Sequence, residues 1–510
     1  MCADHDGSAE DNPPVPNGVC RAPLTTSSPN GPSLLSPATR AVATSSTAPR
    51  RKPTTLKAFS PNQVPDSILN DPKLLEALRV LPSNYNFEIP KTIWRIRRCN
   101  AKRVALQFPE GLLMFACTIA DILEKFCAPA LEDVVIMGDA TYGSCCVDDY
   151  TARALMCDLL VHYGHSCLIP LQVTNSTSNS DAKPLQTLYV FVDISINVQH
   201  FVDSVKLTFD DFENTKLALV GTIQFSSSLR ASAQLLNQVY KTPVWIPQKK
   251  PLSPGEILGC TSPVLPARPN ASIKSSCGAQ KACSADLGSD GHLCTCGQST
   301  SNERHYSCSS PDSAFDAIVY LGDGRFHLES MMLSNPNVPA YRYDPYSKVF
   351  TIEKYNYPKT LELRLHSVNL AKTTLSQNRN AGPLRTPFKQ AHFAKVAIIL
   401  GTLGRQGNIA LLERLEEMLC EKGIAYVVVL LSEVLPAKLE LFDRSIEAWI
   451  QIACPRLSID WGSSFKAPLL NPYEAMVAFG NQPWKDTYPM DYYSKDGGSW
   501  SVYYSPGSKK

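Results

Sequence analysis

A short apolar strand, a turn and an amphipathic helix recur three times along this chain of 510 residues. The opening strands resemble one another, reading RVALQ at 103–107, KLALV at 216–220 and KVAII at 395–399. The helices are expected at 112–126, 228–239 and 409–421, and the strands that follow them at 134–137, 244–247 and 425–431. Strand, helix and strand at this spacing predict right-handed parallel crossovers. The sequence therefore predicts an α/β fold of three pseudo-repeated domains, each a small, mostly parallel sheet covered by helices.

Composition sets the expected domain boundaries. Residues 1–60 are rich in Pro, Ser, Thr and Ala and lack large apolar side chains, so we expect a disordered tail there. We place the three α/β domains at 61–210, 211–345 and 346–475, and a C-terminal extension at 476–510. The second domain carries a Cys/Ser-rich insertion at 264–312. The cysteines of this insertion do not have the usual zinc-motif spacing, so we interpret it as a surface insertion.

Charge and hydropathy exclude several classes of protein. The formal net charge is +2 with no long basic stripe, so direct binding of nucleic acid is not expected. The apolar runs, such as 426–431, are short and β-branched, which favours buried strands over membrane spans. Acidic residues among the first eleven positions disfavour a secretory signal or a mitochondrial presequence. The 17 cysteines of this long chain are then expected to be reduced thiols of a cytoplasmic protein.

Three cysteines stand in settings that are not typical of core cysteines. Cys145 follows Tyr-Gly-Ser, Cys260 stands in Leu-Gly-Cys-Thr, and Cys454 stands in Ala-Cys-Pro-Arg. Cys145 and Cys260 lie at nearly the same spacing from the opening strands of their domains, whereas Cys454 directly follows the strand expected at 447–452. The repeat therefore predicts two equivalent cysteines and one displaced cysteine. Because loops at the carboxyl ends of parallel strands meet in one crevice, we expect the three thiols to converge.

Three converging thiolates allow more than one kind of centre. They could hold a tetrahedral zinc ion with a water in the fourth position. They could instead bind three irons of a [4Fe–4S] cluster and leave the fourth iron open to a substrate. They could also be three core cysteines that bind no metal. Spacing alone leaves these alternatives open.

Several segments resemble the diphthamide synthesis family. They are residues 138–149, 161–170, 253–261, 321–329, 340–346, 400–407 and 453–462. The resemblance covers roughly residues 60–495, apart from the insertion. It implies three domains around a central cluster site, with the cluster cysteines falling on Cys145, Cys260 and Cys454. The Tyr-Gly-x-Cys motif selects Cys145 and leaves its neighbour Cys146 as a bystander.

The resemblance also implies a transferase of radical S-adenosylmethionine type. A [4Fe–4S] cluster would supply one electron to S-adenosylmethionine, the co-substrate, and break its bond between sulfur and the γ-carbon. The 3-amino-3-carboxypropyl group would then join C2 of a histidine in translation elongation factor 2. On this reading Arg456 is a candidate to hold the methionine carboxylate, and Asp323 and Asp460 are candidates for the amino group or ribose. His165 and His327 are candidate proton-transfer residues.

The implied partners are a paralogous second subunit, in a heterodimer, and a small Cys-rich metal-binding electron donor. One alternative is that this chain is the electron-relay subunit of the same complex, but segments 258–261 and 162–167 favour the catalytic subunit. A second alternative is a zinc-bound interaction scaffold without catalysis. A dehydratase of the quinolinate-synthase type shares the three-domain plan, but its motifs are absent from this chain.

Overall fold

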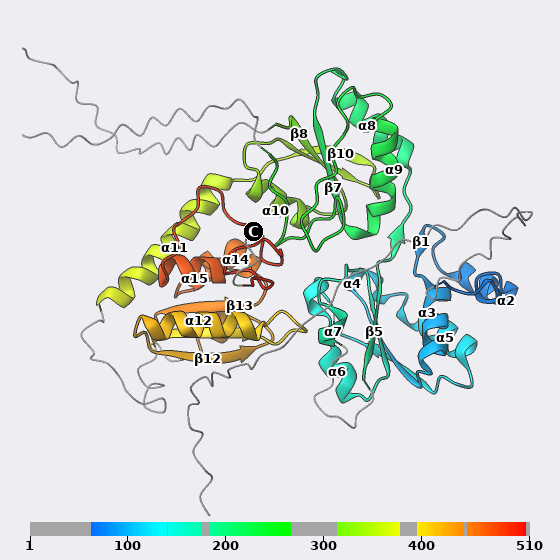
Figure 1. The fold of residues 1–510 in the computed structure, drawn as a ribbon, viewed down its shortest axis with the longest axis horizontal. Helices are drawn as coiled ribbons and strands as arrows, with labels where there is room; N and C mark the ends of the chain where they lie inside the picture. The colour runs from blue at the N-terminus through cyan, green and yellow to red at the C-terminus, as the bar shows by residue number, and fades with distance from the viewer. Residues whose placement is uncertain are drawn as a thin grey trace, which may run out of the picture. The chain divides into compact units, whose positions relative to one another are not determined.

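The structure is a computed structural model that describes residues 63–139, 141–174, 184–266, 314–377, 395–442 and 446–505. The tail predicted at 1–60 and residues 267–312 of the predicted insertion lie outside these ranges. The described residues form three four-stranded sheets and one two-stranded ribbon (Figure 1). This architecture confirms the predicted α/β class.

The first sheet is parallel throughout, with the strand order β3-β2-β4-β5. Its strands are β2 (Arg103–Gln107), β3 (Asp133–Met137), β4 (Leu159–Tyr163) and β5 (Gln186–Val190). Its helices are α3 (Ile89–Cys99), α5 (Ala116–Cys127), α6 (Asp149–Ala154) and α7 (Leu171–Thr174). Successive side chains of β2 reach opposite faces, so Val104 shares a core with α3 and α5 while Ala105 shares one with α6. Helices α3 and α5 accordingly lie on one side of the sheet and α6 and α7 on the other (Figure 1).

The second sheet has the order β10-β9-β8-β7, and only its edge strand β10 is antiparallel. Its strands are β7 (Leu217–Gly221), β8 (Ala317–Leu321), β9 (Ala340–Asp344) and β10 (Val349–Glu353). Its helices are α8 (Val198–Thr208), α9 (Ser226–Leu236) and α10 (Phe326–Ser334). Leu219 packs with α8 and α9, whereas Val220 packs with α10 on the opposite face.

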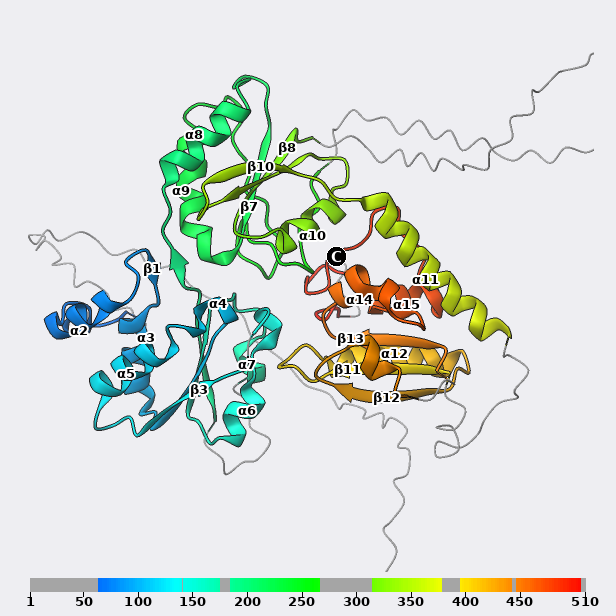
Figure 2. The same cartoon turned by 180° about the vertical axis from the view of Figure 1, so that it is seen from behind.

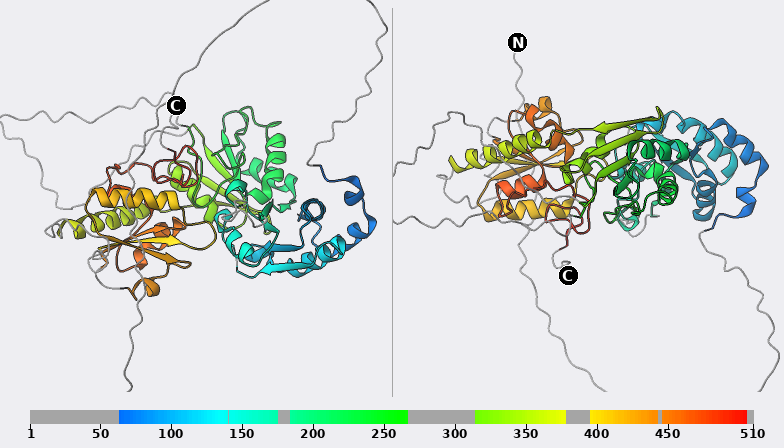
Figure 3. Two further views of the ribbon diagram at one scale, coloured as in Figure 1. Left: turned by 60° about the horizontal axis from the view of Figure 1, so that its bottom comes forward. Right: turned by 90° about the horizontal axis from the view of Figure 1, so that it is seen from above.

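The third sheet is again parallel, with the order β12-β11-β13-β14. Its strands are β11 (Val396–Gly401), β12 (Tyr426–Leu431), β13 (Ala448–Ile452) and β14 (Leu469–Leu470). Its helices are α11 (Tyr357–Gln377), α12 (Ile409–Glu421), α13 (Pro436–Leu439), α14 (Arg456–Trp461) and α15 (Pro472–Ala478). Helix α12 runs along one face of this sheet (Figure 2; Figure 3), because Leu411 and Leu415 pack against Ile398 and Ile450.

Short elements complete the described chain. They are α1 (Asp66–Leu69), α2 (Pro72–Ala77), α4 (Glu110–Leu113), 3-10 turns at Leu78–Val80, Ser144–Cys146, Ile223–Phe225 and Gly462–Ser464, and the ribbon of β1 (Tyr85–Asn86) with β6 (Asp193–Ile194). Among the described residues, no helix has the length and apolar character needed to cross a membrane.

Three local predictions differ from the structure. The strand expected at 244–247 is reduced to a single parallel bridge between Trp245 and Ala218, since Pro247 has no N–H group to donate to a longer ladder. The domain boundary expected after residue 345 falls between β9 and β10, which pair as a hairpin of the second sheet. The extension expected at 476–510 begins inside α15, and it contributes buried side chains, among them Tyr488, Tyr492 and Trp500, to the core.

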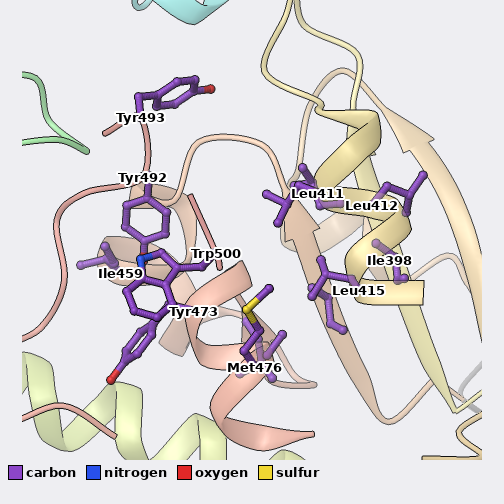
Figure 4. Close-up of a cluster of buried hydrophobic side chains, with 14 of the residues drawn as sticks. Ile398, Leu411, Leu412, Leu415, Ile459, Tyr473, Met476, Tyr492, Tyr493 and Trp500 are labelled. Atoms are coloured by element: carbon purple, nitrogen blue, oxygen red, sulfur yellow. The ribbon is translucent and has the colours of Figure 1, made fainter. Parts of the chain in front are cut away.

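That core is shared between segments far apart in the sequence. One continuous set of buried apolar side chains includes Ala105 and Leu160 of the first sheet, Leu333 of α10, and Ile450 of the third sheet. Aromatic residues from the C-terminal segment complete it, among them Trp500, which is 2% exposed. Figure 4 shows Trp500 beside Tyr473 and Tyr492, with Tyr493 pointing away from them. The loops that follow the strands are therefore fixed on a common apolar base.

Candidate metal centre

The three cysteines predicted as ligands lie at the carboxyl ends of strands or strand-like segments. Cys145 follows β3, the strand on one side of β2. Cys260 follows a segment that bridges β7 on the side away from β8. Cys454 follows β13, which pairs with β11 on the side opposite β12. The topology thus agrees with the prediction of two equivalent cysteines and one displaced cysteine.

The three thiols converge closely enough to affect one another electrostatically. A hydrogen bond with Cys146 and burial raise the pKa of Cys145, and the charges of Cys260 and Cys454 add to the effect. Burial, followed by the charge of Cys454, raises the pKa of Cys260 to about 12. Burial is also the main cause that raises the pKa of Cys454 to about 11. Without a bound cation, this group of thiols would resist deprotonation, as expected for partly buried thiols that face one another.

The donor set fits a polynuclear centre. All three thiols are reduced and only partly buried, so their sulfur atoms are available as soft ligands. A single zinc ion would need the sulfurs about 3.8 Å apart, given its usual bond length and tetrahedral angle. Among the described residues, no group of three His, Cys, Asp or Glu side chains is arranged to hold one metal ion. An iron–sulfur cluster does not require that close spacing, because each thiolate binds a different iron.

A tyrosine that the sequence analysis missed lies among the three thiols. Tyr493 is 3% exposed. Burial raises its pKa, and so do the charges of Cys145, Cys260 and Cys454 and a hydrogen bond with Cys145. The tyrosine is held in place by its backbone N–H, which donates to Thr261 Oγ1 at 3.0 Å. The only sequence signal was the run of aromatic residues between 484 and 504, which is unusual for a solvated extension.

The C-terminal segment forms a strap across the Cys260 turn. Thr261 bridges Asp491, and the Ser262 N–H donates to the carbonyl of Met490 at 2.9 Å. Nearby, the Ser262 hydroxyl donates to the carbonyl of Ser330 at 2.8 Å, which ties the same turn to α10. The turn that carries Cys260 is therefore fixed from both sides, which restricts the direction of its thiol.

Two glutamines anchor the other cysteine loops from inside the sheets. Gln107, at the end of β2, donates through Nε2 to the carbonyl of Cys146 at 3.0 Å. Gln451, in β13, donates through Nε2 to the carbonyl of Cys454 at 3.0 Å. Each glutamine lies in an internal strand of its sheet, and its exposed fraction is at most 3%. A buried amide with both ends satisfied costs little and fixes the loop backbone.

Arg456, predicted to bind a substrate carboxylate, already has protein partners. Its Nε donates to Asp460 at 2.9 Å, and its Nη2 forms an ion pair with Glu329. Its Nη1 donates to the carbonyls of Phe326 and Gly259 at 2.8 and 3.3 Å. The guanidinium also lies 4.4 Å from the centre of the Phe326 ring. Most of its N–H groups are engaged, so the predicted carboxylate contact would require an exchange of partners.

The two predicted aspartates lie in different settings. Asp460 pairs with Arg456 within α14, and burial raises its pKa while the guanidinium opposes that effect. Asp323 is exposed after β8, and its charge acts on Tyr320 and Tyr346. The contacts of the described residues bring Asp460, but not Asp323, next to a cysteine loop. The substrate roles assigned to both residues remain predictions.

The two predicted histidines, one after β4 and one in α10, lie close enough to affect each other electrostatically. Burial lowers the pKa of His165 to about 4, and the charge of His327 adds to this. Burial lowers the pKa of His327 to about 4 as well, with a contribution from Arg456. In both rings the buried Nδ1 atom has no hydrogen-bond partner among the described residues. Both imidazoles are therefore neutral at pH 7 and have hydrogen-bonding capacity that the described protein leaves unused.

Glu256, another residue not singled out from the sequence, lies in the same region. It is 2% exposed, and burial raises its pKa, while the hydroxyl of Ser166 opposes the rise. Its Oε2 accepts from the Ser253 N–H at 2.9 Å, but its Oε1 has no partner in the described part of the chain. Ser166 in turn contacts Ser144, beside Cys145, at 3.0 Å. The region around the thiols thus offers several buried polar groups to a ligand.

Comparison with known proteins agrees with the resemblance seen in the motifs. Residues 108–489 match the family model described as "Putative diphthamide synthesis protein". The chain belongs to the diphthamide synthesis family. A protein from Dictyostelium discoideum is 49% identical over 88% of this chain and 79% of its own length, and one from Gallus gallus is 50% identical over 86% and 88%. A human protein is 48% identical over 86% and 83%. All three are named 2-(3-amino-3-carboxypropyl)histidine synthase subunit 1.

Solved structures of this family show a similar fold. Dph2 from Pyrococcus horikoshii aligns over 79% of this chain and 93% of its own, with a TM-score of 0.52 and 21% sequence identity. A second structure of that protein, described as containing a 4Fe-4S cluster, aligns over 80% and 93% with the same TM-score. At this identity the likeness supports the α/β fold of the family member described here.

Proposed function

We propose that this chain is the catalytic subunit that carries out the first step of diphthamide biosynthesis. The reaction would transfer the 3-amino-3-carboxypropyl group of S-adenosylmethionine to C2 of a histidine imidazole in translation elongation factor 2. The carrying observation is the convergence of Cys145, Cys260 and Cys454 from the ends of three different sheets. The names of relatives near 50% identity support the diphthamide assignment.

The proposed ligands of a [4Fe–4S] cluster are Cys145, Cys260 and Cys454. Once bound, such a cluster supplies the electron that allows the sulfur–carbon bond of S-adenosylmethionine to break without oxygen or hydride chemistry. The protein would contribute orientation and exclusion of water. Tyr493 interacts with all three thiols, and its backbone is bonded to the turn that carries Cys260. His165 and His327, both neutral at pH 7, would accept the proton that leaves the modified imidazole.

The proposed assembly follows the same assignment. The partners would be a paralogous second subunit, elongation factor 2 as substrate, and a small Cys-rich metal-binding electron donor, all in the cytoplasm. The name "subunit 1", which the relatives carry, supports a multi-subunit enzyme. Arg456, Asp323 and Asp460 remain candidates for binding S-adenosylmethionine, and Arg456 and Asp460 lie on the element that follows Cys454.

An electron-relay subunit is the second candidate function. It would use the same cysteines but would have no use for the unpartnered polar atoms of His165, His327 and Glu256 near the thiols. Those atoms favour a centre that binds a substrate. A zinc-bound scaffold would retain the thiols as ligands and would cleave no S-adenosylmethionine.

Electron paramagnetic resonance of the anaerobically purified, dithionite-reduced chain separates these functions. We expect a [4Fe–4S] signal that shifts on addition of S-adenosylmethionine and disappears in Cys145→Ala, Cys260→Ala and Cys454→Ala. Cys117→Ala, which removes an exposed thiol on α5, is the matched control and should leave the signal unchanged. A signal insensitive to S-adenosylmethionine would support the relay, and bound zinc without a cluster would contradict the proposed reaction.

A further inference from the structure

Two adjacent thiols reach the candidate centre, but they have different surroundings. Burial is the main cause of the raised pKa of Cys454, and the charge of Cys146 adds to it, so Cys146 is near the centre. Cys146 also directly follows Cys145 in the chain. Yet Cys146 is 1% exposed, while Cys145 is only partly buried. The Sγ of Cys146 accepts a hydrogen bond from Gln406 Nε2 at 3.4 Å. The backbone of Cys146 is held separately, by Gln107.

Gln107 cannot readily release the Cys146 backbone. Its Nε2 donates to the Cys146 carbonyl at 3.0 Å, while its Oε1 accepts from the Asp148 N–H at 3.2 Å and from His162 Nδ1 at 2.8 Å. This set of partners fixes which end of the amide faces Cys146. The Cys146 residue is therefore held at its carbonyl from the first sheet and at its sulfur from the third.

Gln406 belongs to a loop that grips the Cys145 segment across the two sheets. Arg405 directly precedes Gln406, and its backbone N–H donates to the carbonyl of Cys145 at 2.8 Å. The Arg405 guanidinium binds both carboxylate oxygens of Asp149, each at 2.6 Å. Asp149 is fully buried, and Arg405 also donates to the hydroxyl of Tyr150 at 2.6 Å. A bidentate pair of this kind fixes direction as well as distance.

The loop can approach this closely because Gly404 precedes Arg405. Gly404 has a φ of +55°, and a Cβ atom there would lie 2.5 Å from the carbonyl carbon of Cys146. Any other residue would have to move the backbone of the Cys146 turn or of the loop itself. Gly404, Arg405 and Gln406 thus form one device, which we call the latch.

We infer that Gln406, held by the latch, is the positioning residue that keeps Cys146 bonded within the protein and leaves Cys145 as the ligand of the metal centre. The inference rests on the proposed function, because it assumes that the centre exists. For Cys146 to act as a ligand, its sulfur would have to leave a buried site and give up the Gln406 amide. The latch contacts Cys145 through its carbonyl, which accepts from the Arg405 N–H, whereas the Cys145 sulfur has its hydrogen bonds with Tyr493 and Cys146.

Alkylation of the metal-free chain tests this inference without any measurement of activity. Under anaerobic conditions, N-ethylmaleimide should modify Cys145 at least tenfold faster than Cys146, as read by fragment mass spectrometry. The Gln406 amide is one of the groups that lower the pKa of Cys146 to about 7, so its loss raises that pKa. Gln406→Ala should nevertheless raise the rate at Cys146 at least tenfold, because release of a sulfur that is now buried outweighs this effect, with little change at Cys145. Gln199→Ala, which removes an exposed glutamine bonded to Asp203, is the matched control and should change neither rate. Equal rates in the unmodified chain, or no response to Gln406→Ala, would overturn the inference.

Iron content separates failure of this inference from failure of the proposed function. Cys145→Ala should lose its iron, Cys146→Ala should keep it, and Cys145→Ala combined with Gln406→Ala should regain part of it through Cys146. Thermal melting confirms that each variant is folded. A folded Cys146→Ala that loses its iron, or a folded double variant that regains none, would overturn the inference. Iron content indifferent to Cys145, Cys260 and Cys454 together would instead overturn the proposed centre, whatever the alkylation rates.

Discussion

Removal of the Tyr493 hydroxyl tests whether its hydrogen bond affects the thiol of Cys145. In Tyr493→Phe the ring remains buried and the Thr261 contact to its backbone is kept, but the hydrogen bond with Cys145 is lost. A donor to a ligand sulfur stabilises the more negative, reduced state of a cluster. A bond of about 1 kcal/mol corresponds to about 40 mV for one electron. We therefore expect the midpoint potential to fall by roughly that amount in an anaerobic redox titration followed by electron paramagnetic resonance.

Tyr503→Phe provides the comparison for this prediction. Tyr503 is a nearby C-terminal tyrosine whose hydroxyl donates to the carbonyl of Leu168 and whose ring packs against Tyr493. Tyr503→Phe removes the same phenolic oxygen from the same C-terminal segment and leaves the hydrogen bond between Tyr493 and Cys145 in place. A potential that shifts equally in both variants would show that the effect is general packing rather than a bond to sulfur.

Buried imidazoles should make the stability of the chain fall in mild acid. Burial lowers the pKa of His165 and His327 to about 4 in the folded state, against about 6.5 in the unfolded chain. Between these values the unfolded state binds more protons, so the free energy of unfolding decreases as the pH falls from about 6.5 towards 4. Each imidazole accounts for up to about 3 kcal/mol over that range.

Urea unfolding at several pH values checks this prediction. His165→Gln should flatten the dependence of unfolding free energy on pH by close to one proton. His366→Gln, which replaces an exposed histidine on α11, should leave the dependence as it is. A flattening that is the same in both variants would contradict the assignment of the acid sensitivity to the buried ring.

At the scale of elements, the loop after β11 joins the third sheet to the first. Arg405→Ala removes both bonds to Asp149 and leaves a fully buried carboxylate with Arg153 as its remaining cationic partner, at 3.0 Å. A buried charge that loses its partner costs about 3 kcal/mol. We expect a loss of roughly that size in denaturant unfolding, with Arg405→Lys recovering only part of it because lysine cannot bind both oxygens.

An exposed ion pair sets the scale for that loss. Lys466 pairs with Glu440 on the surface of the third domain, with side chains 77% and 42% exposed. Lys466→Ala should cost less than about 1 kcal/mol, because water screens the pair. Comparable losses from Lys466→Ala and Arg405→Ala would mean that the Arg405 pair does not act as a buried link between the two sheets.

Elements that depend on local pattern could be predicted, and those that depend on distant contacts could not. Apolar periodicity and turn residues predicted the positions of β2, β7 and β11 and of the helices that follow them. The repeat predicted that Cys454 would lie on a different loop of its domain from the one that carries Cys145 or Cys260. The latch and the strap gave no such signal. Arg405 finds Asp149 and Tyr493 finds Thr261 only in the folded chain, across more than 200 positions of sequence. The ligand roles of the three cysteines still rest on resemblance and convergence.

At the scale of the whole molecule, the shared core implies that the three sheets do not unfold independently. Side chains of the first and third sheets, of α10, which packs on the second sheet, and of the C-terminal segment belong to one buried apolar set. The C-terminal segment contributes Trp500 to this set. Its ring centre lies 5.0 Å from that of Tyr473, and its Nε1 donates to Asp491 at 2.6 Å. Removing a buried indole costs about 3 to 5 kcal/mol. Trp500→Ala should therefore destabilise every element that contributes side chains to this core.

Hydrogen exchange followed by mass spectrometry can locate that loss. Trp500→Ala should speed exchange in β4 and α10 as well as in β13, because all three elements contribute side chains to the core that opens. Trp461→Ala, which removes an indole that is 63% exposed, is the matched control and should change the unfolding free energy by about 0.5 kcal/mol or less. If faster exchange stayed within the third sheet, the C-terminal segment would stabilise that sheet alone. The strap over Cys260 would then have to be held by its own hydrogen bonds to Thr261 and Ser262, and the convergence of the thiols would not depend on a common core.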